Sequence, residues 1–122
     1  MEYPIWRYLD ALGKKDLSKA VKILHSLLDF GSQVPPIVSN LATFFDKVYW
    51  TGNKKKAKAN YPQLNMTLTK NLNTYAGNYS SVEIISIYRM LRIIDLRSKL
   101  TSITPVNLLM PMTIRICRGI YV

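Results

Sequence analysis

The chain has 122 residues, of which 48% are hydrophobic and 20% are charged; this composition is typical of one globular domain over residues 1–122 and excludes a disordered polymer. Lys and Arg outnumber Asp and Glu by 17 to 7, and the net charge of +10 favours nucleic acid or acidic partners without naming one. A single cysteine excludes an intrachain disulfide, and no apolar run approaches the roughly 18 residues that span a bilayer, so we expect a cytoplasmic chain that is neither exported nor membrane-spanning.

Two helices are predicted at the start of the chain. Apolar residues at helical spacing run from Tyr3 to Leu12, and Gly13 follows where a left-handed residue favours a helix end. Asp16 is placed to cap a second helix, which Gly31 ends.

A third helix is predicted to begin at Pro35-Pro36 and to reach Trp50, because proline suits the first helical turn. The stretch from Thr51 to Asn60 is interpreted as a loop. Beyond Pro62, apolar residues recur at helical spacing, although part of the pattern also alternates as in a strand. The helical set is Leu64, Leu68, Leu72 and Tyr75, the alternating set is Leu64, Met66 and Leu68, and Gly77-Asn78 breaks the element.

The clearest helix start is at Ser80, because Glu83 three residues later completes a reciprocal capping pattern. The helix from Ser81 to about Leu100 has apolar residues nearly all round its axis, a pattern that predicts a central helix contacted from several sides.

Thr104-Pro105 predicts the start of a last helix, and Pro111 in its interior is expected to kink or end it. Residues Met112 to Val122 are then open to an extended conformation. Together the segments predict an all-α fold, a single antiparallel bundle of five to six helices with short connections.

The sequence offers no pattern of catalytic or ligand-binding residues, so we predict a chain that is not an enzyme and that has no cofactor. It lacks the glycine-rich Lys-Ser or Lys-Thr loop of an ATP site. His25, the only histidine, has Asp29 one turn later but no nucleophile beside it, which favours a boundary histidine over a general base. One histidine, one cysteine and scattered acids predict no metal site.

Charged residues suggest two further features. Lys54, Lys55, Lys56 and Lys58 with Tyr61 form the densest basic run. This run is interpreted as a solvated loop, or alternatively as the phosphate contact of a stand-alone basic nucleic-acid-binding domain. Asp95 and Lys99 are spaced for an ion pair, with Arg92 three residues before Asp95, and the apolar surroundings favour a structural, interhelical role for Asp95.

Three stretches carry a resemblance to a known family. They are Tyr8–Asp16 running into Ala20–Leu24, Gly31 with Pro35–Ile37 and Leu41–Phe45, and Asn78–Ser80 leading to the Asp-Leu-x-x-Lys pattern within Leu91–Lys99. In this order they resemble the C-terminal collar domain of the delta subunit of the bacterial DNA polymerase III clamp loader, most closely the Bacteroidetes type.

The resemblance implies a non-catalytic domain of a DNA-directed DNA polymerase holoenzyme. Such a domain joins the collar that other subunits, of the gamma/tau and delta-prime types, form while the sliding clamp is loaded on primed DNA. Contact with DNA would be indirect or weak. A full delta subunit carries two preceding ATPase-like domains, one of which grips the clamp, and this chain does not include them. We therefore expect an excised domain without clamp-opening activity.

Two departures from the family concern the C-terminal part. The family usually has a glycine soon after the lysine of the Asp-Leu-x-x-Lys pattern, whereas this chain has Leu100, and Pro111 interrupts the last helix. The predicted assembly surface combines faces of the third, fifth and sixth helical segments, because these segments have more apolar residues than packing within one bundle requires. Its candidate anchors are Trp50, Tyr88 and Arg92.

Overall fold

The computed structural model describes residues 3–52 and 65–121, and all regular structure in these ranges is helical, which confirms the predicted all-α class. The helices are α1 (Ile5–Gly13), α2 (Leu17–Asp29), α3 (Val34–Gly52), α4 (Met66–Lys70), α5 (Leu72–Asn78), α6 (Ser81–Leu100) and α7 (Pro105–Arg118).

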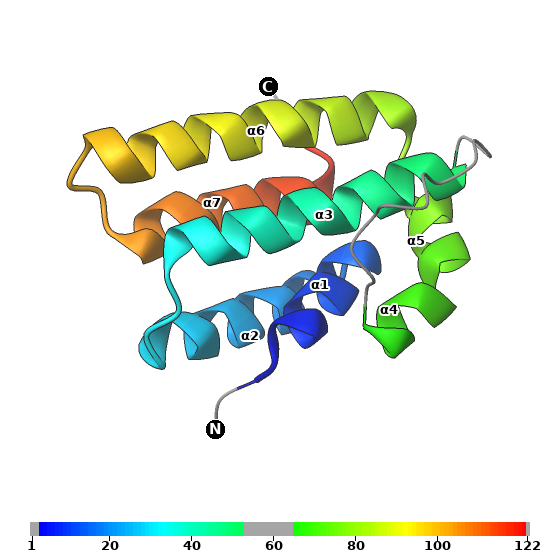
Figure 1. Cartoon of the computed structure of the whole chain (residues 1–122), viewed down its shortest axis with the longest axis horizontal. Helices are drawn as coiled ribbons and strands as arrows, with labels where there is room; N and C mark the ends of the chain where they lie inside the picture. The colour runs from blue at the N-terminus through cyan, green and yellow to red at the C-terminus, as the bar shows by residue number, and fades with distance from the viewer. Residues whose placement is uncertain (1–2, 53–64, 122) are drawn as a thin grey trace.

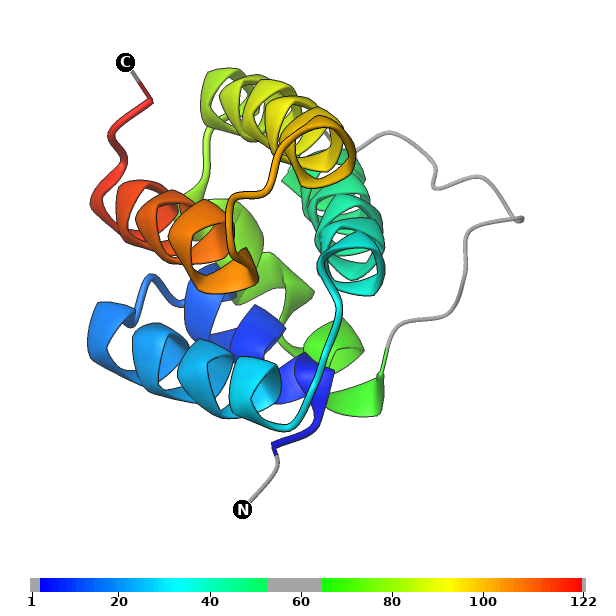
Figure 2. The same cartoon turned by 90° about the vertical axis from the view of Figure 1, so that its left-hand side faces the viewer.

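Four long helices, α2, α3, α6 and α7, lie side by side with neighbouring helices antiparallel, and the short α4 and α5 cover one end (Figure 1). The most extensive contacts between helices are those of α3 with α6, α3 with α5, α1 with α2 and α2 with α7. Viewed from one end, α6 lies at the edge of the bundle, with α3 and α7 on its inner side (Figure 2).

Aromatic side chains form the centre of the core. The Phe44 ring lies 5.1 Å from Phe45 and 5.2 Å from Tyr75, and Phe45 lies 5.2 Å from Tyr79, in tilted or edge-to-face geometries. Such pairs stabilise a fold beyond their buried area. They join α3 to α5 and to the residues that precede α6.

The predicted fourth helix is two short helices separated at Asn71. Leu68 and Tyr75 are buried as their helical spacing predicts, whereas Met66 is exposed, so the strand alternative is wrong. Asn65 is the N-cap residue of α4, where its side chain accepts a hydrogen bond from the Thr67 backbone, and Asn71 is the N-cap residue of α5. Packing of the Tyr75 ring, rather than helix length, holds this segment in place.

The end of α1 differs from the prediction at Gly13. The left-handed residue of this turn is Lys15, with φ of 55°, whereas Gly13 lies inside α1. Glycine is required at position 13 for a different reason. A Cβ atom there would lie 2.3 Å from Cδ1 of Tyr75, which is closer than real contacts allow. At Gly31, by contrast, φ is +92°, and the predicted end of the second helix is confirmed.

The expectation that Pro111 ends the last helix and leaves an extended tail from Met112 is wrong, because α7 continues through Pro111 to Arg118. Pro111 costs the helix a backbone hydrogen bond and about 3 kcal/mol. On either side of it, Leu109 and Met112 are almost fully buried, and burial of each such side chain contributes about 1.5–3 kcal/mol. Tertiary packing therefore outweighs the local preference.

Two further expectations need correction. Thr51 and Gly52 belong to α3 rather than to a loop. More importantly for function, α6 is not a central helix, because its apolar residues divide between a buried inner face and an exposed outer face.

Candidate protein-binding surface

The N-terminus of α6 is fixed by the predicted capping box. The Ser80 hydroxyl accepts a hydrogen bond from the Glu83 backbone at 3.1 Å, and Glu83 Oε1 accepts one from the Ser80 backbone at 3.3 Å. The second oxygen, Oε2, accepts from Lys15 Nζ at 2.9 Å and from the Tyr121 hydroxyl at 3.0 Å. Partial burial opposes ionisation of Glu83, but these hydrogen bonds outweigh it and lower the pKa of the carboxyl.

The inner face of α6 is committed to the fold. Its buried residues recur every three or four positions and face α3 and α7. We define this inner face as Ile84, Ile87, Met90, Leu91 and Ile94. On the flank, the Tyr88 hydroxyl donates a hydrogen bond to Asp46 of α3, which further fixes the rotation of α6 about its axis.

The outer face of α6 carries a second apolar stripe that no described residue covers. Its members share one side of the helix, opposite the inner face. We define this outer stripe as Val82, Ile85, Ile93, Leu96 and Leu100, with exposed fractions of 74%, 44%, 49%, 49% and 78%. Its two halves, Val82 with Ile85 and Ile93 with Leu96 and Leu100, are separated by Arg89, and exposed apolar residues gathered on one side of a helix and bordered by charged residues are typical of interaction surfaces.

Arginines accompany the outer stripe. Arg89 and Arg92 are exposed on the same side of α6, four residues after Ile85 and four before Leu96 respectively. Neither forms an ion pair with a carboxylate in the described part of the chain. Each of those carboxylates accepts a hydrogen bond from another group. The engaged acids are Asp10, Asp16, Asp29, Asp46, Glu83 and Asp95.

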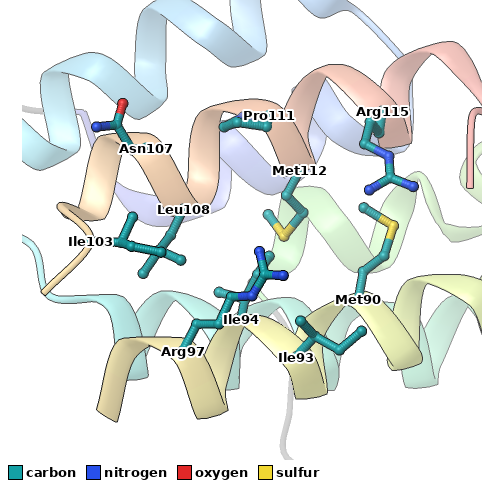
Figure 3. Close-up of a pocket in the computed structure, with 10 residues that line it drawn as sticks. All are labelled: Met90, Ile93, Ile94, Arg97, Ile103, Asn107, Leu108, Pro111, Met112 and Arg115. Carbon is teal, nitrogen blue, oxygen red and sulfur yellow. The ribbon is translucent and has the colours of Figure 1, made fainter. Parts of the chain in front are cut away.

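A groove of about 250 Å³ lies beside the stripe, between α6 and α7. Figure 3 shows its lining residues, with Arg97 extending from α6 and Arg115 from α7 into the space between the two helices. The full lining is Met90, Ile93, Ile94, Arg97, Ile103, Asn107, Leu108, Pro111, Met112 and Arg115. Ile93 belongs to both features, so the outer stripe and the groove form one continuous surface.

The predicted anchors do not gather at one place. Arg92 lies on the side of the outer stripe, Tyr88 is bonded to Asp46 on the flank of α6, and Trp50 is half-buried at the end of α3. The Trp50 ring packs edge-to-face on Tyr49 at 5.6 Å. Of the three, Arg92 is the residue that the structure places on the candidate surface.

Asp95 and Lys99 form the predicted ion pair, with 3.0 Å between Oδ2 and Nζ. The pair runs along the surface of α6, and Asp95 has no hydrogen-bond partner on another helix in the described residues, so the expected interhelical role is wrong. His25 and Asp29 likewise pair on an exposed surface of α2, at 3.1 Å.

The remaining predicted residues give no further site. Lys54, Lys55, Lys56, Lys58 and Tyr61 lie outside the described residues. Within residues 3–52 and 65–121, no group of three His, Cys, Asp or Glu residues is arranged to hold a metal ion. Cys117 is half-buried, and burial raises the pKa of its thiol to about 11.

Sequence reasoning did not assign Arg89, Arg97 or Arg115 to the protein-binding surface. A signal for the first two was present, because the apolar residues of α6 separate by helical spacing into two opposite sets and arginines accompany one of them. No comparable signal existed for Arg115, which reaches the groove only because α7 packs beside α6.

Comparisons with known proteins do not identify a relative. No protein-family model matches the chain, and searches of curated proteins and of solved structures return no significant match. In the part of the chain that is described, no helix has both the length and the apolar character needed to cross a bilayer.

Proposed function

We propose that this chain is a non-catalytic assembly domain that joins a multisubunit complex through the outer stripe of α6. The observation that carries the proposal is the exposed apolar set Val82, Ile85, Ile93, Leu96 and Leu100. Soluble domains rarely expose five large apolar residues on one side of one helix unless a partner covers them. Complete burial of an exposed Ile or Leu side chain contributes about 1.5–3 kcal/mol, so burial of the whole stripe offsets part of the cost of association.

The rigidity of α6 supports this role. The capping box, the Glu83 hydrogen bonds and the Tyr88–Asp46 bond hold the helix in one orientation. A partner therefore meets a preformed surface and does not have to order it, which reduces the entropic cost of association.

The complex that we propose is a bacterial clamp loader, in which the chain acts as the cytoplasmic collar domain of a delta-type subunit. The support is the sequence resemblance together with the all-α bundle that the resemblance implies. The partners would be subunits of the gamma/tau and delta-prime types, and DNA contact would be indirect. In this proposal α6 presents the principal surface and α7 extends it beyond the groove.

The test is co-purification with the other clamp-loader subunits of the same organism. Ile85→Glu with Leu96→Glu places two charges in the outer stripe and is expected to abolish co-purification while circular dichroism stays helical. The control is Met66→Glu, which places one charge on an exposed apolar residue of α4, on the side of the bundle opposite α6 (Figure 1). If the double variant joins the complex as the wild type does, the stripe is not the assembly surface.

A nucleic-acid-binding domain is the second candidate. It is favoured because every described carboxylate accepts a hydrogen bond within the chain, while Lys and Arg outnumber Asp and Glu by 17 to 7. We expect replacement of Lys54, Lys55, Lys56 and Lys58 by alanine to reduce both the affinity for DNA and its dependence on salt. Unchanged affinity and salt dependence would exclude this run as the contact.

A further inference from the structure

The floor of the groove between α6 and α7 is apolar. Ile94, Leu108 and Met112 expose 7%, 6% and 2% of their surfaces, and Met90 exposes 9%. Figure 3 shows Met112 beside the end of Arg97 and Met90 beside the end of Arg115, in the space between the two helices. Methionine side chains adapt to the shape of an incoming group, so this floor suits an apolar side chain without requiring one particular residue type.

The rim of the groove is cationic. Arg97 reaches in from α6 and Arg115 from α7 (Figure 3). Arg115 Nε donates to the carbonyl oxygen of Ile120 at 3.2 Å, which restrains the side chain and leaves its two terminal nitrogens free of that bond. Neither guanidinium forms an ion pair with a carboxylate of the described residues. Two guanidinium groups that line the same apolar groove are suited to a carboxylate that adjoins an apolar group.

The size of the groove limits what it accepts. Small-molecule sites usually measure about 300–1,000 Å³, and this groove, at about 250 Å³, is smaller. A volume of this kind accommodates one or two side chains, as an anchor pocket within a protein interface does.

We infer that the groove is the anchor pocket for an acidic amphipathic helix of a partner chain. One apolar side chain of that helix lies on the floor, and an adjacent Asp or Glu lies between Arg97 and Arg115. This inference rests on the proposed assembly function and specifies the chemistry of the partner, since the same helix then continues along the outer stripe past Ile93.

Charge favours an acidic partner over a second copy of this chain. The exposed side of α6 presents Arg89, Arg92 and Arg97, and its acids, Glu83 and Asp95, are already paired with lysines. Two copies would therefore place like charges in contact, which opposes association. A helix with glutamates beside its apolar face neutralises these arginines instead.

The test uses fluorescence anisotropy with a synthetic amphipathic helix that has leucines on one face and glutamates beside them. Matched peptides replace the glutamates with glutamine or the leucines with alanine. We expect the glutamate peptide to bind the wild-type chain about tenfold more tightly than the glutamine peptide, a preference that weakens at high salt, and the alanine peptide to lose binding.

The paired variants are Arg97→Gln with Arg115→Gln, and, as the control, Lys22→Gln with Lys70→Gln. Both pairs remove two positive charges, but Lys22 and Lys70 are exposed residues of α2 and α4 outside the groove. We expect the arginine pair to remove the preference for glutamate and the lysine pair to retain it. The inference would be overturned if the wild-type chain bound the glutamate and glutamine peptides equally, or if the two pairs of substitutions had equal effects. It would also be overturned if the arginine variant lost DNA binding but kept its binding to the glutamate peptide.

Co-purification separates this inference from the proposed function. If the clamp-loader complex forms but the wild-type chain shows no preference for glutamate, the groove inference fails and the assembly function stands. If the complex never forms while the arginine-dependent preference is present, the assembly function fails and the groove still binds acidic helices.

Discussion

The inner face and the outer stripe of α6 consist of similar apolar residues but have opposite surroundings. The inner face packs on α3 and α7, with Ile87 fully buried and Ile84 only 2% exposed. The outer stripe, one half-turn away, exposes Ile85 and Ile93 by 44% and 49%. Apolar character alone therefore does not distinguish residues that hold the fold from residues that are available to a partner.

This difference in burial predicts two kinds of mutational effect. Substitution on the inner face should lower the free energy of unfolding, because it opens a cavity that the neighbours only partly fill. Substitution in the outer stripe should leave unfolding almost unchanged and alter association instead.

The largest effect is expected for Ile87→Ala, which should lower the free energy of unfolding by about 2–5 kcal/mol. Ile85→Ala is the matched control, since it makes the same change two residues away on the same helix, and it should shift the value by about 0.5 kcal/mol or less. Urea denaturation of both variants gives the comparison. A loss of several kcal/mol for Ile85→Ala would mean that the outer stripe is part of the folded core.

An intermediate effect is expected for Glu83→Gln at the start of α6. The substitution removes the charge that accepts hydrogen bonds from Lys15 and Tyr121, and should cost roughly 1–2 kcal/mol at neutral pH. The pKa of Glu83 in the folded chain is lower than its ordinary value of 4.5, so this stabilisation is present above that value and is lost as the pH falls through the folded pKa.

Urea denaturation of the Glu83→Gln variant across this acidic range provides the check. The difference between the wild type and the variant should be largest near neutral pH and should shrink as Glu83 becomes protonated. A difference that is independent of pH would show that the carboxylate charge does not fix the start of α6.

The smallest effect is expected for Asp95→Asn. Its ion pair with Lys99 lies along the helix surface, where such pairs contribute about 0.3–0.5 kcal/mol. Thermal unfolding at low and high salt should show a small difference that decreases with salt. A loss of about 3 kcal/mol or more, typical of a broken buried ion pair, would return Asp95 to an interhelical role.

Local sequence signals were sufficient to predict several helix boundaries. The Asp16 cap and the Ser80–Glu83 capping box depend on hydrogen bonds between residues three apart, and both are present in the structure. The same local reasoning failed at Pro111, where buried residues from distant parts of the chain hold α7 together. It also failed at Gly13, which is required by the Tyr75 ring of another helix.

The candidate surface was only partly predictable, for the same reason. Arg92 and the excess of apolar residues on the third, fifth and sixth segments were visible in the sequence. The groove was not visible, because Arg97 and Arg115 belong to different helices and meet only through the packing of α6 against α7.

The sequence by itself determined that the chain is helical, where most of its helices begin, and that α6 is apolar round most of its circumference. Those properties follow from the spacing and the hydrogen bonding of neighbouring residues. Only the tertiary structure decided which side of α6 is buried. A helix can bury only the sides that face other helices, and α3 and α7 cover one side, so the outer stripe and the rim of the groove remain exposed.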